Sequence, residues 1–179
     1  CLTMSNFSII LDTETLDTPP NHGVITEIAM LAFERSTFQV VDHLILFPQI
    51  LPQLAAGRTV SADTIDFHTR CGSLPVSLGE HSLQDCMVHI MGFFARLDPD
   101  RVWMQGPDFD RPLLDHFFWQ NGQKLPWKYN RSRDTRTIWD VAFPGTKPAP
   151  RPHHAFEDCE ATLRDLQSSL KELNRLEAA

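Results

Sequence analysis

Apolar residues gather in short runs near the start of the chain, and these runs have the composition of β-strands. They cover residues 7–12, 24–34 and 38–47 and are rich in β-branched and aromatic side chains. The polar residues 35–37 separate the second run from the third, which is typical of a tight turn. We therefore expect these runs to form an antiparallel meander of strands.

The rest of the chain alternates helical periodicity with short strand candidates. Ser61 and Ser82 each precede a helical segment and have side chains that suit an N-cap. Helices interleaved with strands predict an α/β fold with a mixed central sheet flanked by helices. The segments are helices over residues 61–68, 82–97, 108–120 and 155–176, a strand over 101–105, a strand running into a helix over 134–143, and a Pro-rich surface loop over 144–152.

The composition indicates one ordinary globular domain. Hydrophobic residues make up 42% and charged residues 22% of the 179 residues. We expect residues 1–179 to form a single domain whose residues 1–6 are a disordered or non-native start. No apolar run approaches the roughly 20 residues that a membrane span needs. The four cysteines lack C-x-x-C spacing, which favours a reducing, cytoplasmic compartment over a zinc knuckle or a disulfide framework.

Charge is distributed unevenly along the chain. The formal net charge is −7, but residues 124–151 carry seven basic and two acidic residues, which gives this segment +5 and leaves −12 for the rest. A basic segment on an acidic body suits a local contact with a polyanion beside a site that holds cations. The alternative is an ordinary solvated loop that contains several arginines.

Two carboxylates, Asp12 and Glu14, follow the first apolar run. Residues i and i+2 of a strand point to the same face, so these side chains would project together. Two carboxylates so close repel each other unless one is protonated or a cation lies between them, and Mg²⁺ prefers oxygen ligands. The D-x-E pattern is not specific by itself, because it occurs a second time at Asp158–Glu160. The alternative is therefore that Asp12 and Glu14 mark a strand end that reaches solvent.

Further acidic residues occur where helices begin. Asp110 lies just inside the helix expected after the strand over residues 101–105, and Asp158 lies in the first turn expected for the last helix. Asp108 is a second candidate ligand, but its place after Pro107 favours an N-cap. Glu27, a polar residue within an apolar strand, is expected to form a hydrogen bond near this site rather than to bind metal.

In order and context these segments resemble the DEDD exonucleases, which have a ribonuclease H-like fold. The first motif of that family, D-x-E at the end of a strand, is matched by "LDTET". The second, an aspartate preceded by Phe, is matched by "GPDFDRPLL". The third, H-x-A-x-x-D-x-x-A-T, is matched by "HHAFEDCEAT". The resemblance spans residues 8–170, nearly the whole chain.

The general base divides this family into a histidine and a tyrosine branch. The only tyrosine, Tyr129, lies 29 residues before Asp158, so the tyrosine branch is excluded. His153 has the spacing of the histidine (DEDDh) branch, and His154 is the neighbour that competes with it. The unit "DTRT" also resembles an exonuclease VIII-like branch of phages and prophages, which includes exoribonuclease-like members.

The resemblance implies a metal-dependent 3′-5′ exonuclease that acts on DNA or RNA and releases nucleoside 5′-monophosphates. Two divalent ions, Mg²⁺ or Mn²⁺, would be held by Asp12, Glu14 and Asp158 and by Asp12 and Asp110, with His153 taking a proton from the attacking water. The alternatives are a non-catalytic nucleic-acid-binding module on the same fold and a ribonuclease H-type endonuclease.

The resemblance also implies contacts to the substrate. Leu16 and the backbone that follows Asp12 would bind the terminal nucleotide. The side chains of Thr13 and Thr15 are expected to be ordinary strand side chains. Arginine forks fit phosphate oxygens, so the basic segment would supply phosphate contacts. A homodimer, in which a partner's basic surface extends the groove, is a further expectation. The expected substrate-binding residues are Thr13, Thr15, Leu16, Arg131, Arg133 and Arg136.

Overall fold

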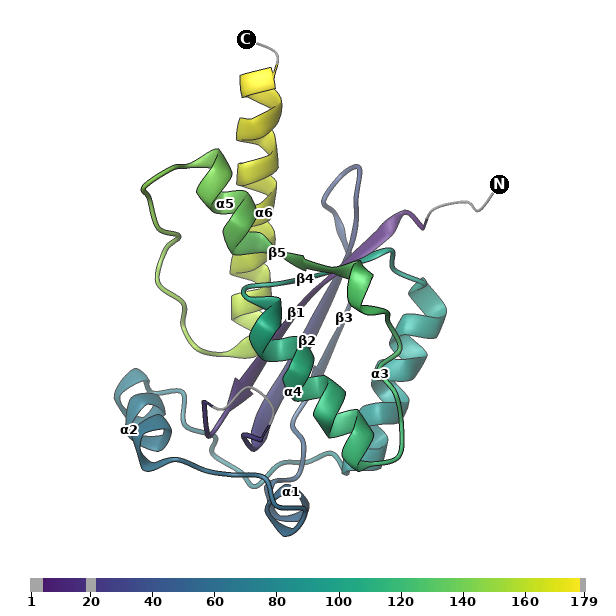
Figure 1. Cartoon of the computed structure of the whole chain (residues 1–179), viewed down its shortest axis with the longest axis vertical. Helices are drawn as coiled ribbons and strands as arrows, with labels where there is room; N and C mark the ends of the chain where they lie inside the picture. Colours follow the sequence, from purple (N-terminus) through teal and green to yellow (C-terminus); the bar gives the residue numbers. More distant parts are fainter. Residues whose placement is uncertain (1–4, 19–21, 178–179) are drawn as a thin grey trace.

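The sheet at the centre of the protein has five strands in the order β3-β2-β1-β4-β5 (Figure 1). The structure is a computed structural model that describes residues 5–18 and 22–177. The strands are β1 (Phe7–Thr15), β2 (Ile25–Glu34), β3 (Val40–Leu46), β4 (Arg101–Met104) and β5 (Ser132–Asp134). The helices are α1 (Ile50–Ala55), α2 (Ala62–Cys71), α3 (Leu83–Leu97), α4 (Pro107–Gln120), α5 (Thr135–Ala142) and α6 (Ala155–Glu177), with a short 3-10 helix at Tyr129–Arg131.

The sheet is mixed, as the sequence predicts. β1, β2 and β3 form an antiparallel meander. β4 pairs parallel with β1, and β5 pairs parallel with β4. The parallel strands β1 and β4 therefore end at the same edge of the sheet, and α4 begins just after β4.

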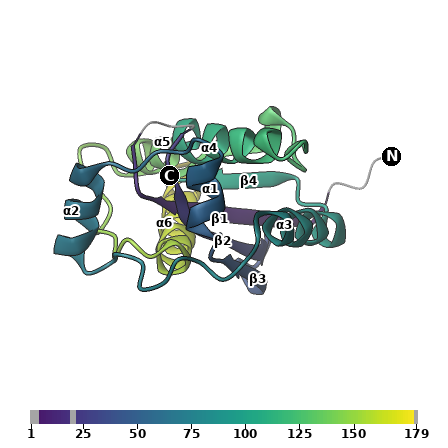
Figure 2. The ribbon, with the colours of Figure 1, turned by 90° about the horizontal axis from the view of Figure 1, so that it is seen from below.

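Helices cover both faces of the sheet, and β1 alternates between them. Ile9 and Leu11 pack into a core with α3 and α4. Ile10 packs on the other face with Ala155 and Cys159 of α6. Because side chains of a strand alternate, the even-numbered positions that follow Ile10 face α6 and the odd-numbered ones face α4. α2 lies at the opposite side of the molecule from α3 (Figures 1 and 2).

Local signals explain most helix boundaries. Ser61 and Ser82 are N-caps, and their hydroxyls accept hydrogen bonds from the backbone N–H groups of Thr64 and Asp85. The N-cap predicted at Asp108 is wrong, because α4 begins at Pro107 with Gly106 as its N-cap. Proline suits the first helical position, since its φ is already helical and its missing N–H would have no partner there.

Other details differ modestly from the expectations. α1 was not predicted, because prolines at positions 48 and 52 indicate a strand end, although proline is tolerated in the first turn of a helix. The predicted start at residues 1–6 lies partly outside the described residues, while Ser5 and Asn6 form hydrogen bonds with Leu97 and Glu34. Within the described part of the chain, no helix is long and apolar enough to span a membrane.

Candidate active site

The predicted acidic residues and His153 line one cavity of about 340 Å³. Asp12 and Glu14 reach it from β1, Asp110 from the first turn of α4, and Asp158 from the first turn of α6. These segments are far apart in the sequence, and the sheet edge where β1 and β4 end brings them together. The remaining lining residues are Thr13, Gln105, Phe109, Arg136 and Arg151.

The strand and the helix that supply two of these acids are packed firmly against each other. Cys159 is fully buried, and its thiol lies against the carbonyls of Ile10 and Ala29 on β1 and β2. Asp158, one residue earlier, is 5% exposed and faces the cavity that Asp12 lines. The packing of α6 on the sheet therefore sets the separation between these two carboxylates.

The side chain of Asp110 forms a hydrogen bond with a residue of β1. The hydroxyl of Thr13 donates a hydrogen bond of 2.7 Å to Oδ1 of Asp110, and both residues are buried. Thr13 occupies an odd-numbered position of β1, so its side chain points toward α4. The expectation that this side chain is an ordinary strand side chain is wrong, because it orients a buried carboxylate. The Thr15 hydroxyl instead donates to the carbonyl of Asp17, a local contact.

Burial and the closeness of the other carboxyl groups make these groups weaker acids than exposed carboxyl groups. Burial raises the pKa of Asp12 well above its ordinary value, and the neighbouring Asp110, Glu14 and Asp158 raise it further. Burial also raises the pKa of Glu14 to about 8 and that of Asp110 to about 7. The pKa of Asp158 rises to about 6, again mainly through burial.

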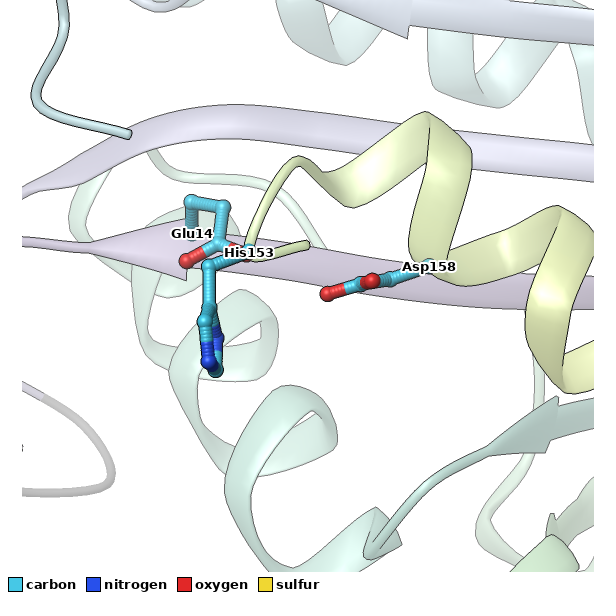
Figure 3. A group of neighbouring side chains, drawn as sticks. All are labelled: Glu14, His153 and Asp158. Atoms are coloured by element: carbon cyan, nitrogen blue, oxygen red, sulfur yellow. The ribbon is translucent and has the colours of Figure 1, made fainter. Parts of the chain in front are cut away.

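The donor set fits hard divalent cations. Oδ1 of Asp158 is buried and has no hydrogen-bond partner among the described residues. Ligand atoms of Glu14, His153 and Asp158 all lie within 4.8 Å of one another. Figure 3 shows these side chains at the end of β1, in the loop before α6 and in the first turn of α6. A cation among these oxygens would stabilise the ionised carboxylates and so lower their pKa values.

His153 belongs to this cavity, and His154 does not. The His153 backbone has a positive φ of 61°, and its ring meets the Phe67 ring edge-on, with the centroids 4.7 Å apart. Burial raises the pKa of Asp158, and the polar backbone of His153 acts in the opposite direction and lowers it. His154 lines a neighbouring cavity of about 250 Å³, which shares Glu14 with the first but contains none of the three aspartates. Between the two histidines, the geometry favours His153 as the residue that acts with the acids.

Glu27 connects α6 to β2. It lies opposite Glu14 in the register of β1 and β2. Its Oε2 accepts a hydrogen bond of 3.2 Å from the backbone N–H of Ala155, the first residue of α6. The predicted role of Glu27, a hydrogen bond near the site, is confirmed.

The arginines of the basic segment divide into two groups. Arg136 lines the acidic cavity, and Gly106, with φ 103°, leaves room for its guanidinium. Arg131 pairs with Asp98, and Arg133 donates to backbone carbonyls of its own segment. Both line another cavity, of about 590 Å³, so the structure does not bring them to the acidic residues.

Leu16 is buried at the end of β1. Its side chain is 6% exposed and packs with Val24 and Ile50. Its backbone N–H donates to the carbonyl of Val24. The predicted contact of Leu16 with a terminal nucleotide is not tested by this arrangement.

Arg151 was not predicted as a site residue, although it lines the cavity. Its guanidinium donates to Oε1 of Gln105 at 3.3 Å and pairs with Asp165 of α6. Its positive charge lowers the pKa of Asp158. One indication in the sequence that Arg151 could reach the site is that it belongs to the basic segment and lies two residues before His153.

His68 is a second residue that the sequence did not reveal. It is 3% exposed, and its Nε2 lies 2.9 Å from the carbonyl oxygen of Thr15. Burial lowers its pKa, so the ring is neutral and forms no ion pair with Glu14, whose Oε2 is 3.9 Å away. No spacing pattern in the helix sequence distinguishes it from an ordinary helical histidine.

Comparison with known proteins places the chain in a family. Residues 7–169 match the Rv2179c-like 3′-5′ exoribonuclease domain. The chain belongs to this family. No curated protein sequence matches the chain. The family membership confirms the predicted class of enzyme, a 3′-5′ exonuclease.

Solved structures confirm the fold of this Rv2179c-like domain. The zinc-bound complex of E. coli exonuclease I with single-stranded DNA superposes with a TM-score of 0.73 at 14% identity, over 98% of this chain and 42% of that chain. E. coli exonuclease I with an oligonucleotide gives a TM-score of 0.66 at 14% identity, over 92% of this chain and 40% of the other. Cell-death related nuclease 4 gives a TM-score of 0.68 at 13% identity, over 93% and 64%.

These relatives establish the ribonuclease H-like fold that the sequence predicts. The chain spans about two fifths of the length of exonuclease I. The activities of the whole exonuclease I protein therefore do not transfer to this chain. The DEDDh assignment and the exonuclease VIII-like branch stay predictions.

Proposed function

We propose that this Rv2179c-like domain hydrolyses the last phosphodiester bond at the 3′ end of a nucleic acid strand, with two divalent ions and His153 as general base. The observation that carries the proposal is the convergence of four acidic side chains and one histidine on a single cavity. Water would attack the phosphorus of the last phosphodiester and the bond from phosphorus to the 3′ oxygen of the preceding nucleotide would break, so the products would be nucleoside 5′-monophosphates.

The acidic residues divide naturally between two ion positions. Asp12, Glu14 and Asp158 would hold one Mg²⁺ or Mn²⁺, and Asp12 and Asp110 the other. The chemistry that ions held by these residues would supply is activation of the attacking water and stabilisation of charge on the leaving 3′ oxygen. Thr13 fixes the rotamer of Asp110 through the hydroxyl hydrogen bond described above, so the second position is preorganised by the strand.

His153 would take the proton from the attacking water. Its ring reaches the same space as the carboxylates of Glu14 and Asp158. Imidazole is a suitable base because its ordinary pKa lies close to neutral pH. His153 lies in the loop between α5 and α6, two residues before α6 begins.

The basic residues of the cavity would bind the substrate phosphates. Arg136 and Arg151 line the cavity together with the acids, and a guanidinium can contact two phosphate oxygens at once. We include Arg136 in the substrate contacts predicted above. The backbone at Thr13, Thr15 and Leu16 and the more distant Arg131 and Arg133 remain predicted contacts that the structure leaves untested.

RNA is the proposed substrate. The matching family is described as exoribonuclease domains, whereas the exonuclease I structures contain DNA oligonucleotides. The family match covers most of the chain at the level of sequence, and the likeness to exonuclease I supports only the fold. A homodimer, a cytoplasmic location and the exonuclease VIII-like branch stay predictions from the sequence.

The test compares RNA and DNA oligomers of one sequence, labelled at the 5′ end or at the 3′ end. We expect single nucleotides from the 3′ end in the presence of Mg²⁺ or Mn²⁺ and none in the presence of EDTA. Internal fragments would instead indicate an endonuclease, and binding without cleavage would indicate a non-catalytic module.

A matched pair of variants links the activity to the cavity. Asp110→Asn removes a buried carboxylate of the cavity and should abolish nucleotide release. Asp108→Asn removes an exposed carboxylate from the same helical turn, outside the cavity, and should leave release unchanged. Full activity of Asp110→Asn would refute the proposed mechanism.

A further inference from the structure

Helix α2 contacts the site through two consecutive residues, Phe67 and His68, whose functions the family motifs do not describe. Phe67 contacts the ring of His153. His68 contacts the end of β1, one residue beyond Glu14. The same helical turn therefore touches both the proposed general base and the strand that carries the first two acids.

The contact between Phe67 and His153 has a defined geometry. The ring centroids are 4.7 Å apart and the ring planes are inclined by 78°, an edge-to-face arrangement that aromatic rings favour. Phe67 is 37% exposed, so its ring is not an ordinary core side chain. Burial alone does not account for an aromatic residue at this position.

His153 needs a contact of this kind. Its φ of 61° lies in the left-handed region, which a residue with a Cβ adopts only when its surroundings hold it there. The residue before it is Pro152, and the loop from residue 144 to 152 contains no regular secondary structure. The ring of Phe67 contacts the side chain of His153 at this position.

His68 connects α2 to the sheet. A carbonyl oxygen can only accept a hydrogen bond. Nε2 of His68 therefore carries the ring proton and donates a hydrogen bond to the carbonyl of Thr15. Nδ1 of the neutral ring then accepts from the hydroxyl of Ser73, 2.8 Å away. Both ring nitrogens are satisfied within a buried environment, which fixes the orientation of the ring and with it the position of α2 relative to β1.

We propose that α2 positions the general base: Phe67 orients the ring of His153 toward the acids, and His68 fixes α2 to the end of β1. Phe67 is a positioning residue, because it acts through His153. This inference rests on the proposed function, in which His153 accepts the proton of the attacking water. It predicts that the loop before α6 depends on α2 for its catalytic arrangement.

The test uses three variants on one helix. Phe67→Leu removes the aromatic ring but keeps an apolar side chain, and Phe67→Tyr restores the ring. Ile65→Ala is the matched control, because Ile65 is equally exposed on α2 and lies outside the cavity. Misplacement of a catalytic group by about 1 Å reduces turnover by roughly 100-fold, so Phe67→Leu should lower kcat by about 10- to 100-fold.

The kinetic pattern separates positioning from folding or substrate binding. KM for the oligomer and the dependence on metal concentration should stay close to wild type in Phe67→Leu, since neither the acids nor the arginines are altered. Phe67→Tyr should recover most of kcat, and Ile65→Ala should retain it. Unchanged kcat in Phe67→Leu, or an equal loss in Ile65→Ala, would overturn the proposal.

A spectroscopic readout tests the contact without catalysis. The Phe67 ring should displace the proton resonances of the His153 ring by its ring current, and His153→Gln identifies those resonances by their loss. Phe67→Leu should remove the displacement in the metal-free protein, and Phe67→Tyr should keep it. Resonances that are the same in wild type and Phe67→Leu would overturn the proposal. If wild-type protein released no nucleotide, the proposed function would fail, whereas this measurement would still decide whether Phe67 holds His153.

Discussion

Thr13 provides the sharpest test of how the sheet prepares the site for metal. Its hydroxyl donates to Oδ1 of Asp110 at 2.7 Å within the protein interior. Thr13→Val removes that donor and keeps the shape of the side chain. Thr13→Ser keeps the hydroxyl, and Thr15→Val removes a hydroxyl that donates to the Asp17 carbonyl. The three variants isolate one hydrogen bond.

The expected magnitude follows from the pKa of Asp110, which burial raises to about 7 although the Thr13 hydrogen bond lowers it. A hydrogen bond to a charged group contributes about 1.5–3 kcal/mol, so its loss raises this pKa further, by about 1 to 2. At pH 7 the carboxyl group would then be about 90–99% protonated instead of about half. Because metal must displace that proton, the apparent affinity for Mg²⁺ should fall about 5- to 50-fold.

The same reasoning predicts a dependence on pH. At pH 9 the carboxyl group is almost fully ionised in wild type and at least about half ionised in the variant, so the loss of affinity should shrink to about twofold or less. Isothermal titration with Mg²⁺ at pH 7 and pH 9 measures both values. Wild-type affinity in Thr13→Val at pH 7 would refute the reasoning, as would a loss of the same size at the two pH values. Thr13→Ser and Thr15→Val should bind like wild type.

Further predictions concern stability and the pH profile. The raised pKa of Glu14, about 8, means that the unfolded chain releases this proton first, so the metal-free protein should lose stability as pH rises from about 4.5 to 8. Urea unfolding at pH 5 and pH 8 measures this loss, and Glu14→Gln should reduce it. Gly106→Ala should destabilise the protein by about 1 kcal/mol, because the backbone φ is positive and the Arg136 guanidinium lies nearby. Gly92→Ala should stabilise it by up to about 1 kcal/mol, because Gly92 lies within a helix and a Cβ there would meet no neighbour. Equal effects of the two changes on thermal unfolding would contradict the argument. Arg151→Met removes a charge that lowers the pKa of Asp158, so the acidic limb of the pH–rate profile should move to higher pH; an unchanged limb would contradict that role.

The sequence predicted the acids from their local positions together with the ordered motifs that resemble the DEDD exonucleases. Alternation along a strand puts Asp12 and Glu14 on one face, and the first turn of a helix that follows a strand holds Asp110 near the sheet edge. The same rules place Asp158 on α6. These local rules place each acid near a well-marked boundary, but it was the resemblance to the DEDD exonucleases that joined the boundaries into one expected site.

Residues that act across the fold were not predictable in the same way. The contact of His68 with Thr15 depends on where α2 docks, and no local pattern states which strand end a short helix will meet. The role of the Thr13 side chain depends likewise on α4 approaching from the opposite face. Charge alone did not separate Arg136 from Arg131, because the pairing of Arg131 with Asp98 joins segments that are distant in the sequence.

The hydrogen bond from the first amide of α6 to Glu27 joins the start of that helix to a strand residue that does not line the cavity of acids. A change at position 27 would therefore remove a bond that holds the first turn of α6, the turn that carries Asp158, without altering any residue of the cavity. Among natural or selected variants of this domain, catalytic defects should appear at a position that an inspection of ligands alone would dismiss.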